Sequence, residues 1–130
     1  MNKAIDASTW IEFAETDISA ATHLFNTHYP IPTNIVCYLC QQSVEKALKA
    51  VLVQNNVTVP KTHDINKILD IVAVYEPSIT LEENIADKIT TFAIESRYPD
   101  EVFDFTKDDA EFILKYSKEI LDNVKKVIDK

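Results

Sequence analysis

The chain has 130 residues, of which 46% are hydrophobic and 26% are charged, and its formal net charge is −8 at pH 7. This length and composition suit a single globular domain, which we expect to span residues 1–130, and they exclude a disordered or fibrous protein. The absence of glycine excludes the glycine-rich loops of P-loop and Rossmann proteins, and the acidic balance argues against non-specific binding to long nucleic acid.

The first predicted helix begins at a cap on Ser8 or Thr9 and ends near Asn26. The side chains predicted to face the core form a stripe that is apolar except for Asp17. They are Trp10, Phe13, Ala14, Asp17, Ala21, Leu24 and Phe25. Residues 27–32 contain two prolines, which remove amide donors, so this segment is predicted to be a connector.

A second helix is predicted over residues 33–54, which contain no helix breaker. Its apolar residues occupy more than one face, which is typical of the most buried helix of a bundle. Asn55 and Asn56 are the expected stop, because asparagine tolerates the left-handed cap conformation.

Three further helices are predicted by their start signals. Thr62 or Asp64 caps a short third helix, a capping box over residues 80–83 opens a fourth, and residues 106–109 open the last with acids in its first turn. No segment alternates as a strand would. The sequence therefore predicts an all-α protein, an antiparallel bundle of about five helices.

Two observations concern the cellular compartment. Residues 1–10 contain no apolar signal region, and no apolar run approaches the roughly 20 residues that cross a bilayer, so we expect a cytoplasmic protein without a membrane segment. Cys37 and Cys40 have C-x-x-C spacing, but they fall inside an apolar helix without further ligands. We expect them to be reduced core residues, and we expect no metal site.

Polar residues form a stripe on the predicted central helix, at Gln42, Glu45, Lys46 and Lys49. Their steps of three, one and three place them on one side of a helix. One interpretation is a solvated strip with a weak pair between Glu45 and Lys49. The other is the wall of a groove or a subunit contact.

Two more positions could bind an anion. His63 and Asp64 stand at a helix start, where free amides attract anions; alternatively Asp64 caps the helix and His63 packs. His63 could also act as a general acid or base. Arg97, the only arginine, could grip a phosphate with two donors or could cap the preceding helix.

Three blocks, residues 40–50, 60–65 and 96–100, resemble in order and separation the HEPN family of prokaryotic helical domains. The resemblance implies a helical bundle that usually dimerises, is often encoded beside a minimal nucleotidyltransferase, and has been proposed to bind nucleotides. Carried over to this chain, it implies the ligand-binding set Gln42, Glu45, Lys46, Lys49, His63, Asp64, Arg97 and Tyr98.

Many HEPN proteins are ribonucleases with an arginine and, after four to six intervening residues, a histidine. Here those positions, 102–104, hold valine, phenylalanine and aspartate. The resemblance therefore implies a binding module without a catalytic site or cofactor, paired with a nucleotidyltransferase in a toxin-antitoxin-like system. The alternative is a ribonuclease toxin with a rearranged site, in which His63 is the general acid and Arg97 holds the phosphate.

Overall fold

The computed structural model describes residues 5–95 and 105–128, and within these ranges it contains helices and no strand. In chain order the helices are α1 (Ala7–Thr27), α2 (Thr33–Gln54), α3 (Ile65–Tyr75), α4 (Glu83–Glu95) and α5 (Lys107–Ile128). The prediction of an all-α bundle with five helices is confirmed. Within the same ranges, no helix combines the length and apolar character that crossing a membrane requires.

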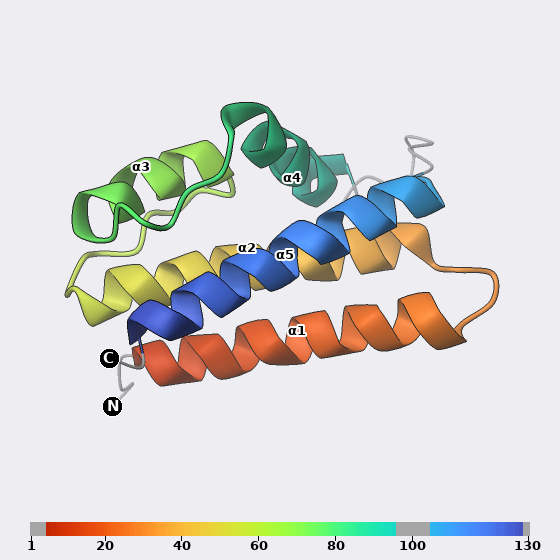
Figure 1. Ribbon diagram of the computed structural model, residues 1–130, viewed down its shortest axis with the longest axis horizontal. Coiled ribbons are helices and arrows are strands. Elements are labelled where there is room, and N and C mark those ends of the chain that lie inside the picture. The colour runs from red at the N-terminus through yellow and green to blue at the C-terminus, as the bar shows by residue number, and fades with distance from the viewer. Residues whose placement is uncertain (1–4, 96–104, 129–130) are drawn as a thin grey trace.

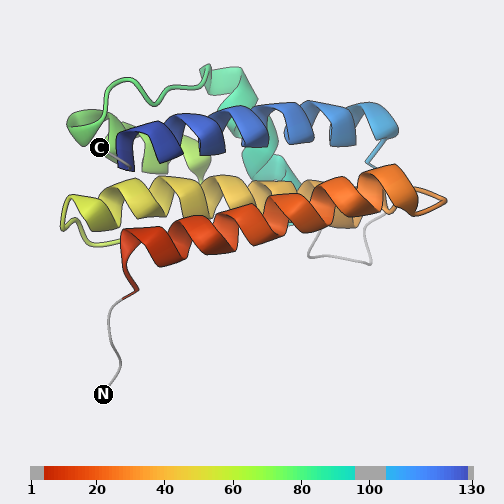
Figure 2. The ribbon, with the colours of Figure 1, turned by 60° about the horizontal axis from the view of Figure 1, so that its bottom comes forward.

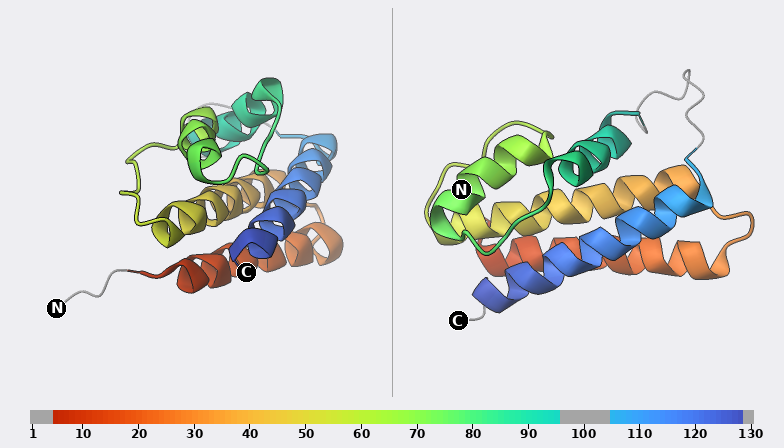
Figure 3. Two further views of the ribbon diagram at one scale, coloured as in Figure 1. Left: turned by 60° about the vertical axis from the view of Figure 1, so that its left-hand side comes forward. Right: turned by 45° about the horizontal axis from the view of Figure 1, so that its top comes forward.

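The three long helices α1, α2 and α5 run along the length of the molecule, and the shorter α3 and α4 lie together over α2 (Figures 1 and 3). Helix α2 packs against all four others, while α1 also contacts α5 and α3 contacts α4. The start of α1 and the end of α5 lie at the same end of the bundle (Figures 1 and 2). Because α2 contacts all four other helices, a polar group in the middle of α2 reaches solvent between those helices.

Helix α2 has the predicted bounds and the predicted central place. Its buried side chains come from several faces and include Val36, Cys40, Leu48 and Leu52. A helix that is apolar on several sides is stable in water only when other elements cover those sides. The chain leaves α2 at Asn56, whose φ of 58° is the left-handed conformation expected at this stop.

Helix α1 differs from its prediction in two respects. Its N-cap is Asp6, whose carboxylate accepts a hydrogen bond from the Thr9 amide at 2.8 Å, so the caps predicted at Ser8 or Thr9 are wrong. The stripe prediction was also partly wrong, because it omitted Ile11 and Ile18, which are buried, and included Phe13, whose ring is 44% exposed. Because α1 packs against both α2 and α5, its buried face is rotated from the predicted one.

Helix α4 begins at Glu83, two residues later than the predicted capping box places it. The Glu82 carbonyl accepts hydrogen bonds from the amides of Ile85 and Ala86, both at 3.0 Å, and so starts the helix. Thr80 lies in a non-helical segment in which its neighbour Ile79 is 1% exposed. Burial of Ile79 holds this segment against the core and delays the helix.

Helix α5 begins at Lys107, within the predicted segment and with Asp108 and Asp109 in its first turn as predicted, and its start forms a capping box that was not predicted. The Thr106 amide donates to the Asp109 carboxylate at 2.9 Å, and the Asp109 amide donates to the Thr106 hydroxyl at 3.1 Å. Two amides at the start of α5 are thereby satisfied reciprocally.

Candidate functional site

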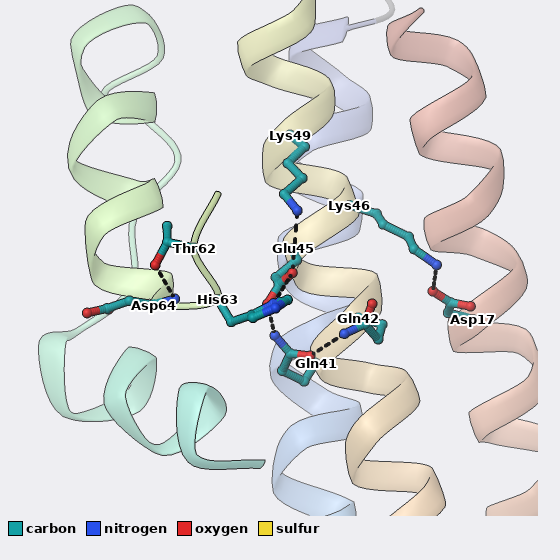
Figure 4. A network of polar contacts seen from close by, with 9 residues as sticks. All are labelled: Asp17, Gln41, Gln42, Glu45, Lys46, Lys49, Thr62, His63 and Asp64. Atoms are coloured by element: carbon teal, nitrogen blue, oxygen red, sulfur yellow. Dashed lines mark hydrogen bonds and ion pairs between the residues drawn. The ribbon is translucent and has the colours of Figure 1, made fainter. Parts of the chain in front are cut away.

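A buried carboxylate on α2, that of Glu45, collects three partners (Figure 4). The Gln41 side-chain amide donates to its Oε1, the His63 Nδ1 lies 2.8 Å from Oε1 and 3.1 Å from Oε2, and the Lys49 Nζ lies 3.5 Å from Oε2. The Glu45 side chain is only 2% exposed, which is rare for a carboxylate unless it is paired. We call these four residues the Glu45 cluster.

Two kinds of local structure assemble the Glu45 cluster. Gln41, Glu45 and Lys49 follow each other at four-residue steps, which place their side chains along one line of a helix. His63 arrives from the connection between α2 and α3 (Figure 4). The residue after it, Asp64, caps α3 by accepting hydrogen bonds from the amides of residues 66 and 67, and this cap holds the end of the connection in place.

The arrangement orients the imidazole of His63. Because a carboxylate only accepts hydrogen bonds, the Nδ1 atom facing Glu45 carries the proton, and Nε2 is then the basic nitrogen of the neutral ring. The side chains of Lys49 and His63 are 16% and 44% exposed, so solvent exposure increases outward from the carboxylate. Glu45 thus holds two nitrogen groups at the protein surface in fixed positions.

Lys46 does not join this cluster. Its Nζ lies 2.6 Å from the Asp17 carboxylate of α1, on the other side of Glu45 from His63 (Figure 4). Of the ligand-binding set that the resemblance implies, Lys49 and His63 therefore share the Glu45 carboxylate, whereas Lys46 faces α1. The cause is the rotation of about 100° between consecutive residues of a helix, which turns Lys46 towards α1.

The polar stripe of α2 is not a solvated strip. Glu45 is buried, while Gln42, Lys46 and Lys49 are half-buried. Gln42 donates a hydrogen bond to Gln41 at 3.0 Å and so extends the cluster along the helix. Neighbouring helices cover the stripe because α2 is central, and the interpretation as a weak surface pair is wrong.

The remaining predicted residues have separate places. Asp64 is occupied as the cap of α3, as the structural alternative predicted. Arg97 and Tyr98 lie outside the described residues, as do positions 102–104.

Two members of the site were not predicted. Gln41 is fully buried and donates to Glu45; its position four residues before Glu45 was the available signal. Asp17 was treated as a break in the apolar stripe of α1, although an acid in such a stripe calls for a partner on the next helix.

The two cysteines belong to the core. Cys37 and Cys40 are fully buried, and burial raises the pKa of both thiols to about 12. Neither thiol is ionised near neutral pH, so neither is suited to nucleophilic chemistry. In the part of the chain that the structure describes, no three His, Cys, Asp or Glu side chains are grouped so as to hold a metal ion.

The fold and site define a class of protein, a helical bundle whose central helix carries a buried, histidine-orienting carboxylate. The model of the HEPN domain family matches residues 7–127. The chain belongs to the HEPN domain family.

One curated relative and two solved structures resemble the chain. The relative, a protein of Methanocaldococcus jannaschii named "Putative toxin MJ1304", is 33% identical in an alignment of 138 positions, gaps included, which covers 92% of this chain and 86% of that protein. The structure of TT1696 from Thermus thermophilus has a TM-score of 0.74 at 24% identity and covers 92% of this chain and 96% of that one. ST0689, described as an archaeal HEPN homologue, has a TM-score of 0.69 at 23% identity, with coverages of 96% and 99%. The two structures support the fold.

Proposed function

We propose that this HEPN protein is a cytoplasmic, homodimeric binding module that acts with a minimal nucleotidyltransferase in a toxin-antitoxin-like pair. In this proposal a nucleotide phosphate binds beside the Glu45 cluster. The observation that carries it is the pair of nitrogen groups, on Lys49 and His63, that the buried carboxylate of Glu45 holds at the surface. The relative named as a toxin supports the toxin-antitoxin setting.

Phosphate suits these groups for a physical reason. An ammonium and an imidazolium both donate charge-assisted hydrogen bonds, which are about twice as strong as neutral ones. Lys49 alone is balanced by Glu45, and a proton on His63 would give the cluster one net positive charge. Because the donors are already oriented, binding costs little additional side-chain entropy.

The phosphate site can be tested by calorimetric titration of ATP and GTP. We expect saturable binding to the wild type and roughly tenfold or greater weakening in Lys49→Ala and His63→Ala, the size of one charge-assisted hydrogen bond. Arg97→Ala is expected to weaken binding as well. The matched control is Lys126→Ala, which removes the same charge from an exposed position of α5 and should not change the affinity. No saturable binding of ATP or GTP to the wild type would end the nucleotide half of the proposal.

The dimer and the partner need separate measurements. Light scattering coupled to size-exclusion chromatography should give twice the chain mass of 14.8 kDa. Co-expression with the product of the adjacent gene should yield a stable complex with a nucleotidyltransferase. A monomer at every concentration would contradict the dimer, and a neighbourhood without any nucleotidyltransferase gene would contradict the pairing.

A second candidate function is a ribonuclease toxin with a rearranged site. The observation that favours it is the bond between Glu45 and His63, because a carboxylate that orients an imidazole is a common arrangement for general acid-base catalysis. Purified wild type would then degrade RNA, and His63→Ala would not. Equal absence of degradation in both proteins would exclude this function.

A further inference from the structure

Two aromatic side chains of α1 lie beside the lysines of α2. Trp10 and Phe13 are three residues apart and so share one side of the helix. The Lys49 Nζ lies 5.8 Å from the centre of the Trp10 ring, and the Lys46 Nζ lies 6.0 Å from the centre of the Phe13 ring. Trp10 is partly buried and Phe13 is 44% exposed. We call this pair the aromatic ledge.

The aromatic ledge is continuous with the Glu45 cluster through Lys49. The same Nζ that lies over Trp10 lies 3.5 Å from the Glu45 carboxylate, which in turn contacts His63 at 2.8 Å. An aromatic surface, an ammonium group and an imidazole therefore follow one another across α1, α2 and the connection to α3. A nucleotide matches this order, because its base would contact the aromatic surface and its phosphate would contact the ammonium and the imidazole.

We infer that the aromatic ledge of α1 binds the base of a nucleotide whose phosphate lies beside Lys49 and His63. This inference rests on the proposed function and specifies its ligand as a nucleoside phosphate, with purines favoured over pyrimidines. Bases stack on exposed aromatic rings regardless of sequence because every base has a π-face, and the larger purine face contacts more of a ring.

The charges set the direction of binding. Lys46 is neutralised by Asp17 at 2.6 Å, so the Phe13 end of the surface has no excess positive charge and a carboxylate there repels phosphate. The opposite end, at Lys49 and His63, gains a positive charge when the imidazole is protonated. The base therefore belongs at Phe13 and the phosphate at His63.

The lysines over the rings do not block this arrangement. Separations of 5.8 and 6.0 Å lie at the outer limit of a cation-π contact, so these contacts are weak. A base that stacks on Phe13 would replace the Lys46 ammonium over that ring, and Lys49 would keep its place beside Glu45 and bind the phosphate.

The test compares AMP, ribose 5-phosphate and inorganic phosphate, with calorimetry for affinity and the fluorescence of Trp10, the only tryptophan, as a reporter of stacking. We expect AMP to bind about tenfold more tightly than ribose 5-phosphate and to change the Trp10 emission, which ribose 5-phosphate should leave nearly unchanged. CMP should bind more weakly than AMP.

Variants of Phe13 separate stacking from general damage to the fold. Phe13→Ala should bring AMP to the affinity of ribose 5-phosphate without changing the latter, and Phe13→Tyr, which keeps the ring, should retain the difference. The control is Val74→Ala, which changes an exposed apolar residue of α3, a helix that lies on the other side of α2 from α1 (Figure 1).

The outcomes distinguish the two proposals. Equal affinities of the wild type for AMP and ribose 5-phosphate, or an unchanged ratio in Phe13→Ala, would overturn the base site and leave the phosphate site standing. No binding of any of the three compounds would overturn both.

Discussion

Glu45 and Lys46 are consecutive charged residues of α2, yet they lie in different surroundings. Glu45 is buried to 2% exposure among three donors, whereas Lys46 is 26% exposed and makes one ion pair with Asp17. The first arrangement compensates a charge that water cannot reach, and the second joins two charges that water still reaches. A shared stripe on a helix therefore does not imply a shared energetic role, because the neighbouring elements decide how much water each side receives.

The contrast requires that the interior side of α2 is closed to solvent. The reactivity of the Cys37 and Cys40 thiols tests this requirement, and it is the prediction with the largest expected effect. Burial raises the pKa of both thiols from 9.0 to about 12, so at a given pH the thiolate fraction falls by about a thousandfold. We expect a disulfide reagent to label neither cysteine in the native protein and both in denaturant. Rapid labelling of the native protein would show that the interior side of α2 is open to water.

Removal of the buried carboxylate is the next largest effect. Glu45→Ala should lower the free energy of unfolding by about 3 kcal/mol, because it leaves the buried amide of Gln41 without its acceptor and sets two positively chargeable groups beside a cavity. Urea unfolding followed by circular dichroism measures this loss. Glu45→Gln should lose less because it preserves the volume. A loss below about 1 kcal/mol for Glu45→Ala would mean that the buried charge of Glu45 stabilises the fold no more than a surface ion pair such as that of Lys46 does, and it would contradict the comparison.

Removal of one donor should cost less. His63→Ala should lower the free energy of unfolding by about 1 to 2 kcal/mol, since Glu45 keeps Gln41 and Lys49 and water can replace a ring that is 44% exposed. The matched control is His23→Ala on the exposed side of α1, for which we expect a change within about 0.5 kcal/mol. Equal losses in the two variants would mean that His63 does not stabilise the buried carboxylate.

The smallest effect is expected for the Lys46 side of the comparison. Asp17→Asn should lower the free energy of unfolding by at most about 0.5 kcal/mol, because the pair with Lys46 is partly exposed and screened. The difference from the wild type should shrink further at high salt. A loss as large as that of Glu45→Ala, independent of salt, would show that the Asp17 pair is as important to the fold as the buried cluster.

The helices were largely predictable because their signals are local. The bounds of α2, the cap of α3 at Asp64 and the start of α5 all depend on side chains within a few residues of one another. The start of α4 was predicted wrongly, although residues 80–83 match a capping box, because burial of the adjacent Ile79 in the core competes with the cap. Local signals thus fail where a tertiary contact involves the same residues.

The candidate site was predictable only in part. The spacing of Glu45 and Lys49 indicates a pair on one helix, and it is present. No spacing could show that His63, 18 residues further on, contacts Glu45, or that Lys46 pairs with Asp17, 29 residues before it. These contacts depend on how α1 and the α2–α3 connection pack against α2.

The sequence by itself determined the helices, the central place of α2 and the resemblance to HEPN domains, because helical periodicity, capping and short motifs are properties of neighbouring residues. Only the tertiary structure decided which charge is buried, which lysine joins His63, and that the aromatic rings of α1 lie beside them. The physical reason is that burial and pairing depend on what covers a helix face, and that covering comes from parts of the chain far away in the sequence.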